Sequence, residues 1–177
     1  MNKTNHNFAH SLFAFGWVAG LCLLLAHQFT IQSQQPMATI HINYPGDLRT
    51  EDLHLQSGTR IYTDAPTDNQ GRGEAFSPTD LVANALGTCM LTTMAIFARR
   101  DGIELARSEA SVTKVMSTDA PRRITRIEIE MTLRAKTADE TPLTEAQQAK
   151  LEQIAHSCPV AISLHPDLEQ VVSVKWE

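Results

Sequence analysis

The stretch Ser77-Pro-Thr-Asp-Leu-Val-Ala-Asn-Ala-Leu-Gly-Thr-Cys89, which continues to Arg100-Asp-Gly102, predicts one long helix with a thiol in its middle. Ser77 can cap the first turn, Pro78 fits the first helical position, and Asp80 places a carboxylate near the positive end of the helix dipole. At the other end, Gly102 can adopt the left-handed conformation that stops a helix.

Apolar residues recur every three or four positions along this predicted helix. They are Leu81, Val82, Ala85, Leu86, Cys89, Met90, Met94 and Phe97. Together they form an arc wider than a single stripe, so we expect neighbours on most sides of the helix. The function of the chain then depends on what the Cys89 thiol does in this buried setting.

The composition sets broad limits on fold and partners. The 177 residues, 42% of them apolar, allow one domain with a substantial core. A formal net charge of −5 provides no basic surface for nucleic acid, so we expect no such partner. The three cysteines, Cys22, Cys89 and Cys158, are too few and too scattered for a small disulfide-stapled scaffold.

The first 36 residues differ in character from the rest of the chain. Lys3 is the only charged residue among them, and an apolar run extends from Leu12 to Ala26. This run is short for a membrane span, and it lacks the basic flank and cleavage site of a clear signal peptide. Met37 resembles a start of its own. Residues 1–36 therefore fit a mis-called start, a signal or an anchor, and residues 37–177 form the predicted domain.

Short strands are predicted on both sides of the Cys89 helix. Before it, residues 39–44 form one strand, and residues 52–56 and 59–64 form a hairpin around Ser57-Gly58. After it, residues 108–118 and 126–133 alternate between apolar and polar positions, and residues 171–176 form a last strand. Because the alternation leaves one face of the sheet in water, we expect antiparallel pairing and an α+β fold.

A second helix is predicted from Thr144, with Gln147 as its capping-box partner. Leu151, Ala155 and Cys158 then share the face that points to the core. Pro159 disfavours helical angles at Cys158, so the helix should end or kink there. If Pro159 opens a new helical turn, Cys158 becomes its N-cap.

The two thiols on these helices have more than one interpretation. A free cysteine usually packs in the core as a small apolar side chain, and this interpretation holds for either cysteine considered alone. If the helices pack together, however, the pair could form a reversible disulfide, which in a reducing compartment is more often catalytic than structural. Local chemistry favours Cys158 as the more reactive thiol, because Cys89 lies too far along its helix to feel the dipole. Cys89 would need a cation from elsewhere, and Arg60 and Arg72 are candidates.

The Ser-Pro-Thr-Asp-Leu-Val-Ala-Asn-Ala-Leu-Gly-Thr-Cys89 segment, followed by His-Ser-Cys158-Pro-Val-Ala-Ile-Ser-Leu, resembles the OsmC/Ohr family of thiol peroxidases. The resemblance covers residues 39–177 and implies an intertwined α+β homodimer with the cysteine helices buried at its centre. It also implies that Cys89 attacks an organic hydroperoxide and that Cys158 resolves the product as a disulfide. In the family an arginine supplies the cation that Cys89 needs. The resemblance therefore implies that Cys89, and not Cys158 as local chemistry favours, is the attacking thiol.

The chain departs from the family pattern at the start of the Cys89 helix. Well-studied members have Asn-Pro-Glu there, and the Glu orients the arginine, whereas this chain places Thr79 at the Glu position and Asp80 one residue later. A shift of one residue turns a helical side chain by about 100°, so Asp80 is not a simple replacement. Glu74 is another possible partner, and the arginine could be Arg49, Arg60 or Arg72.

We therefore expect a homodimeric thiol peroxidase for organic hydroperoxides, reduced by a dithiol and free of metals and cofactors. The alternative is a redox-responsive or ligand-binding domain of the same fold with little peroxidase activity. We expect a cytoplasmic location, unless residues 1–36 export or anchor the chain.

Overall fold

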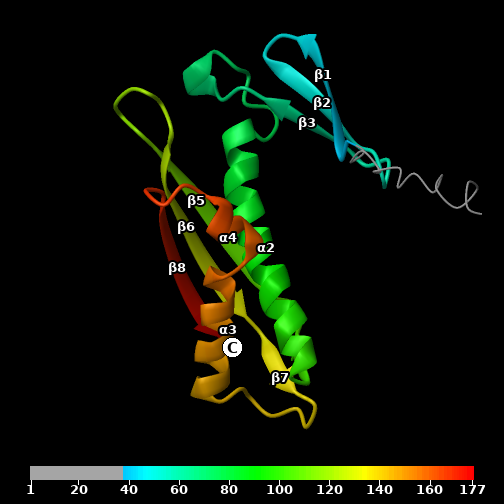
Figure 1. Cartoon of the computed structure of the whole chain (residues 1–177), viewed down its shortest axis with the longest axis vertical. Helices are drawn as coiled ribbons and strands as arrows, with labels where there is room; N and C mark the ends of the chain where they lie inside the picture. The colour runs from blue at the N-terminus through cyan, green and yellow to red at the C-terminus, as the bar shows by residue number, and fades with distance from the viewer. Residues whose placement is uncertain (1–37) are drawn as a thin grey trace, which may run out of the picture. The chain divides into compact units, whose positions relative to one another are not determined.

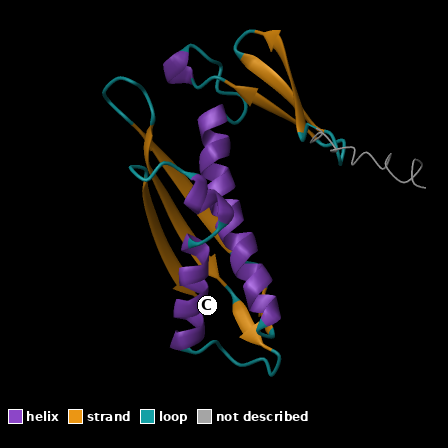
Figure 2. Cartoon of the chain, in the orientation of Figure 1, coloured by secondary structure: helices purple, strands orange, loops and turns teal. Residues whose placement is uncertain are grey.

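The computed structural model describes residues 38–177, so the interpretations of residues 1–36 lie outside it. Figures 1 and 2 show the mixture of helices and strands expected for an α+β fold. In chain order the elements are β1 (Ile40–Gly46), β2 (Arg49–His54), β3 (Arg60–Asp64), the 3-10 turn η1 (Thr67–Asn69), α2 (Pro78–Arg100), β4 (Ile103–Leu105), β5 (Glu109–Met116), β6 (Ile124–Leu133), β7 (Ala135–Thr137), α3 (Glu145–His156), α4 (Pro159–Ser163) and β8 (Glu169–Trp176).

Strands β1, β2 and β3 form an antiparallel sheet that we call the N-terminal sheet. The predicted hairpin at Ser57-Gly58 is confirmed, because Gly58 has a φ of 72° and its N–H donates to the carbonyl of His54. The start of β2 was predicted too late, at Asp52 instead of Arg49. In the turn before β2, Asp47 and Leu48 have positive φ angles. Leucine rarely adopts such an angle, so the sequence gives no clear signal for a turn at this position.

Helix α2 begins and ends where the sequence predicted. Ser77 and Asp80 form a capping box, Pro78 is the first helical residue, and Gly102 beyond the end has a φ of 72°. Only one stripe of the helix is buried, however: Ala83, Leu86, Gly87, Met90, Met94 and Ala98. The expectation of cover on most sides is wrong for one copy of the chain, since β5, α3 and α4 all pack on that stripe and leave the other side exposed.

Strands β5, β6 and β8 form the main sheet, with β6 in the centre. The predicted alternation is confirmed, and the inward residues of β6 (Ile127, Ile129, Met131 and Leu133) are buried. Strands β5 and β6 are antiparallel, but β8 runs parallel to β6, which corrects the expectation of purely antiparallel pairing. The reason is the connection between β6 and β8, which contains α3 and α4 and is long enough for a crossover.

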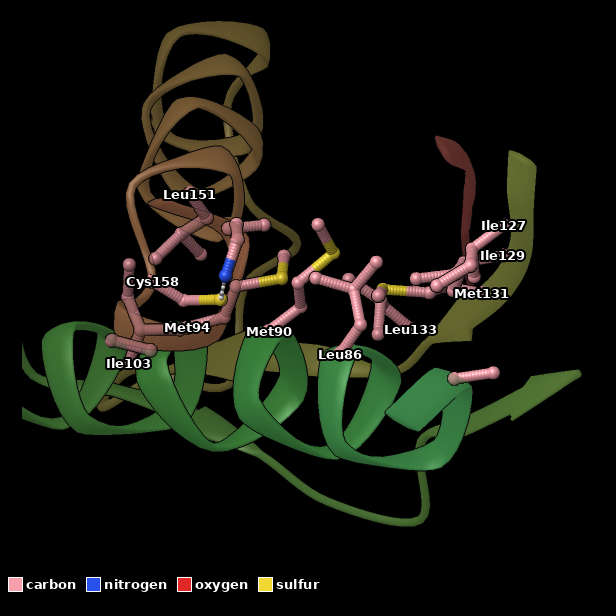
Figure 3. Close-up of a cluster of buried hydrophobic side chains, with 14 of the residues drawn as sticks. Leu86, Met90, Met94, Ile103, Ile127, Ile129, Met131, Leu133, Leu151 and Cys158 are labelled. Carbon is pink, nitrogen blue, oxygen red and sulfur yellow. Dashed lines mark hydrogen bonds between the residues drawn. The ribbon is translucent and has the colours of Figure 1, made fainter. Parts of the chain in front are cut away.

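The core lies between this sheet and the helices, as Figure 3 shows for the side chains of α2, α3 and β6. At Gly87 the helix comes so close to β5 that an added Cβ would lie 2.8 Å from Cγ2 of Val112. The small β4–β7 sheet was not predicted, because each of its strands has only three residues. This packing fixes the middle of α2 against the start of α4, where the two cysteines lie.

Candidate thiol site

Cys158 lies at the junction of α3 and α4. The capping box of Thr144 and Gln147 starts α3 as predicted, and the helix ends at His156. Pro159 then opens α4, so Cys158 is the N-cap of α4 and not a residue of the longer helix. Its sulfur accepts a hydrogen bond from the backbone N–H of Ala161 at 3.4 Å, and the residue is completely buried.

Cys89 lies beside Cys158, and both thiols are free. Cys89 is half-buried in the middle of α2 and packs against the core. Figure 3 shows the sulfur of Cys158 pointing toward the core near Met94 of α2. Burial raises the pKa of the Cys158 thiol, the N–H of Ala161 opposes this shift, and the neighbouring Cys89 thiol raises the pKa further. Cys158 is therefore a protonated thiol at neutral pH.

The arginines proposed as supporting cations are paired with acids of the N-terminal region. Arg60 binds Glu51 at 2.6 Å and Arg72 binds Asp47 at 3.2 Å. Both arginine side chains are more than half exposed, and neither pair includes a thiol.

Arg49 binds Glu74, the acid expected from the sequence as a possible partner of the arginine, at 2.8 Å. This pair ties the N-terminal sheet to the segment that leads into α2. With 30% of its side chain exposed, Arg49 is less exposed than either Arg60 or Arg72.

Asp80 is bound by Lys114, a residue that was not predicted from the sequence to belong to the site. The ammonium of Lys114 binds the Asp80 carboxylate and lies 3.0 Å from the hydroxyl of Ser77. Burial opposes ionisation of Asp80, but the bonds from Lys114 and Ser77 hold its pKa below the ordinary value. The sequence does contain a signal for this contact, because Lys114 occupies an inward position of a strand that alternates between polar and apolar residues. A charged side chain at such a position needs a partner of opposite charge.

Two clefts flank Lys114, and neither is lined by a cysteine. One has a volume of 630 Å³ and includes Glu74, Asp80 and Asn84. The other has a volume of 440 Å³ and extends from the first turn of α2 to the turn between β1 and β2. Within residues 38–177, no three histidine, cysteine or acidic side chains converge on a position for a metal ion.

Comparison with solved structures identifies relatives of the same fold. A protein from Psychrobacter arcticus 273-4, described as an osmotic stress induced and detoxification response protein, is 48% identical, with a TM-score of 0.72 over 79% of this chain and 97% of that one. An organic hydroperoxide resistance protein OsmC from Legionella pneumophila is 17% identical, with a TM-score of 0.56 over 80% of this chain and 99% of that one. An organic hydroperoxide resistance protein from Elizabethkingia anophelis is 14% identical, with a TM-score of 0.59 over 81% of this chain and 99% of that one.

The last two relatives show the fold alone, because their identity to this chain is low. No curated protein matches the chain significantly. The family model described as OsmC-like protein matches residues 71–171, a range that contains both Cys89 and Cys158. Together with the relative that is 48% identical, this match shows that the chain belongs to the OsmC-like protein family.

Proposed function

We propose that this chain is a thiol-dependent peroxidase that reduces organic hydroperoxides through Cys89 and Cys158. The observation that carries the proposal is the proximity of the two thiols, which lie 69 positions apart in the sequence but are neighbours in the fold, close enough for Cys89 to raise the pKa of Cys158. Two neighbouring free thiols can close a disulfide with a small adjustment, and a reversible disulfide is what such a peroxidase needs. Membership of the family supports a general role in oxidative stress.

The two cysteines differ in burial, and this difference indicates which thiol attacks the peroxide and which one closes the disulfide. Cys89 is half-buried and can be reached from one side of α2, whereas Cys158 is fully buried and its pKa is raised. The Cys89 thiolate attacks the peroxide ROOH, the O–O bond breaks, and with one proton the products are Cys89 sulfenic acid and the alcohol ROH. The Cys158 thiol then displaces water from the sulfenic acid and closes the disulfide. A dithiol reductant returns both thiols and becomes a disulfide itself.

We further propose that the active form is a homodimer. The N-terminal sheet exposes apolar residues on the face that carries Ile40 (52%), Ile42 (62%) and Ile61 (45%). Asp52 lies between Ile42 and Ile61 on this face, and its Oδ1 is buried without a hydrogen-bond partner among the described residues. An exposed apolar face with an unsatisfied acceptor is typical of a surface that meets another chain.

The exposed side of α2 supports the same conclusion. Val82 and Ile96 are 38% and 52% exposed on the side that one copy leaves uncovered. A second copy packed there would bury them and restore the cover that the sequence predicts for this helix. It could also supply the cation for Cys89, and Arg49 is the least exposed of the three candidate arginines.

The test is turnover of cumene hydroperoxide by the full chain with dithiothreitol as reductant. We expect multiple turnovers for the native sequence, none for Cys89→Ser, and at most one for Cys158→Ser when its sulfenic acid is not reduced directly. Cys22→Ser is the matched control and should keep full activity, because it removes a thiol from outside the predicted domain. Unchanged turnover in Cys89→Ser would show that another group carries the reaction.

The second candidate function is a redox-responsive domain that forms the disulfide without efficient turnover. The observation in its favour is that Asp80 is bound by Lys114, so that this acid cannot orient an arginine without breaking an existing ion pair. In that case peroxide would link Cys89 to Cys158 in a single event, and excess dithiothreitol would not sustain consumption of the hydroperoxide.

A further inference from the structure

A glutamine of the main sheet points toward the short helix that begins after Cys158. Along β8 the residues alternate between exposed and half-buried positions, and the half-buried ones are Gln170, Val172, Val174 and Trp176. In the sheet, Gln170 is paired with the buried Ile127 of β6. A polar side chain among apolar neighbours needs a hydrogen-bond partner, so the partner of Gln170 indicates what this residue is for.

The partner of Gln170 lies in α4. The side-chain Nε2 of Gln170 donates a hydrogen bond to the carbonyl oxygen of Ala161 at 3.0 Å. Because α4 ends at Ser163, this carbonyl belongs to the last turn and has no N–H of the same helix to accept from. Gln170 therefore supplies a donor that the short helix itself lacks.

The backbone of Ala161 also holds the Cys158 sulfur. The Ala161 N–H donates to Sγ of Cys158 at 3.4 Å, and this bond is the dashed line in Figure 3. Ala161 is thus bonded to the thiol through its nitrogen and to the main sheet through its carbonyl oxygen. The two bonds form a continuous connection from β8 to the sulfur.

Helix α4 depends on such a connection because it has only five residues. A helix of this length is not stable by itself in water, so contacts with the rest of the fold must hold it. One of its apolar side chains, Ile162, is 72% exposed and contributes little to that packing. The position of α4, and with it the direction of the Cys158 side chain, therefore depends on bonds such as the one from Gln170.

A second bond from β8 reaches the preceding helix and offers a comparison. Nε1 of Trp176 donates to the Glu152 carboxylate of α3 at 2.8 Å. Strand β8 is therefore bonded to the segment that carries Cys158 at two points, near the start and near the end of the strand. Of these two bonds, only the one from Gln170 leads to a residue that is bonded to the Cys158 sulfur.

We propose that Gln170 is a positioning residue for the closure of the disulfide between Cys89 and Cys158. In this step the Cys158 thiol displaces water from the Cys89 sulfenic acid, so the Cys158 sulfur must stay directed toward Cys89. Gln170 acts through Ala161, and its effect is on orientation, which strongly influences the rate of a reaction between neighbouring groups. This positioning role rests on the proposed function, because it concerns the second step of that reaction.

The test is a single turnover of the full chain with one equivalent of cumene hydroperoxide and no reductant. Dimedone traps the sulfenic acid at Cys89, and mass spectrometry follows the trapped acid and the disulfide over time. Gln170→Met keeps the length of the side chain but removes its donor. We expect this variant to close the disulfide about fivefold more slowly, as the loss of one hydrogen bond would require, while sulfenic acid forms at the native rate.

Two further variants separate the role of the donor from a general loosening of the fold. Gln170→Lys keeps a donor at a similar reach and should close the disulfide within about twofold of the native rate. Glu152→Met is the matched control, because it removes the other bond from β8, and it should close the disulfide at the native rate. Native closure in Gln170→Met, closure in Gln170→Lys as slow as in Gln170→Met, or equal slowing in Glu152→Met would each overturn the proposal.

Oxidation by diamide separates this positioning role from the peroxidase activity. Diamide converts two thiols to a disulfide without a peroxide, and it is itself reduced to the hydrazine. If the native chain consumes no hydroperoxide, the same variants are compared with one equivalent of diamide, and Gln170→Met should again be the slowest. Closure that is equally fast in the native chain and in Gln170→Met would then overturn the role of Gln170, whereas the failed consumption overturns only the proposed function.

Discussion

Lys114 of β5 binds Asp80 in the first turn of α2, so that a lysine from the sheet neutralises the acid at the positive end of the central helix. The lysine side chain is only 19% exposed, and Asp80 also caps the helix through Ser77. This contact joins the main sheet to α2 at the end remote from the β4–β7 sheet. Two predictions depend on it.

The first concerns stability. Lys114→Met should lower the free energy of unfolding by about 1–2 kcal/mol, because it removes the cation but leaves the partly buried carboxylate in place. Urea denaturation at pH 7 measures the loss. The double variant Lys114→Met/Asp80→Asn should recover part of it, since it leaves no unpaired charge. If the double variant is less stable by the sum of the two single losses, the two residues do not interact.

The second prediction concerns pH. The pKa of Asp80 is lowered from 3.8 in the folded chain, so its carboxylate stabilises the fold above the unfolded-state pKa. This contribution is lost as the pH falls below 3.8 and through the folded-state pKa. Asp80→Asn should therefore cost stability at pH 6 and progressively less from pH 4 to pH 3. Asp139→Asn, at an exposed position after β7, serves as the control, and an equal pH dependence in both variants would contradict the assignment.

The sequence predicted most of the elements that surround the thiols because their signals are local. The N-cap of α2 at Ser77, the capping box of α3 and the alternation in β6 were all visible as short patterns. The parallel pairing of β8 was missed because it depends on the path of the chain through α3 and α4. Lys114 was missed for a similar reason, since Asp80 and Lys114 are 34 positions apart and only the packing of α2 on β5 brings them together.

A third prediction concerns the reactivity of the two thiols. Cys158 is completely buried and its pKa is raised, whereas Cys89 is half-buried. Iodoacetamide should therefore modify Cys89 at least about tenfold faster than Cys158 at pH 7.5, because the thiolate is the reactive form. Mass mapping of the modified peptides at successive times measures both rates. In 6 M guanidinium chloride the two rates should become similar, and a difference that persists there would not come from the fold.

A fourth prediction concerns the core beside Cys158. Leu151 of α3 is 1% exposed and belongs to the cluster in Figure 3, so Leu151→Ala should lower the free energy of unfolding by about 2–5 kcal/mol. Leu55→Ala, at a position that is 48% exposed, should cost less than about 0.5 kcal/mol. Denaturation in urea compares the two variants, and similar losses would mean that the packing of α3 contributes little to stability.

The last prediction concerns the proposed homodimer. Ile42 is 62% exposed on the N-terminal sheet, beside the unsatisfied Asp52. If this face meets a second copy, Ile42→Glu buries a charge in the interface and should shift the chain from dimer to monomer at micromolar concentration. Size-exclusion chromatography with light scattering measures the mass. Val171→Glu is the matched control, because Val171 is an exposed apolar residue on the main sheet, and it should leave the mass unchanged. A native chain that is monomeric, or an Ile42→Glu variant that stays dimeric, would remove this face from the interface and leave the exposed isoleucines without a partner.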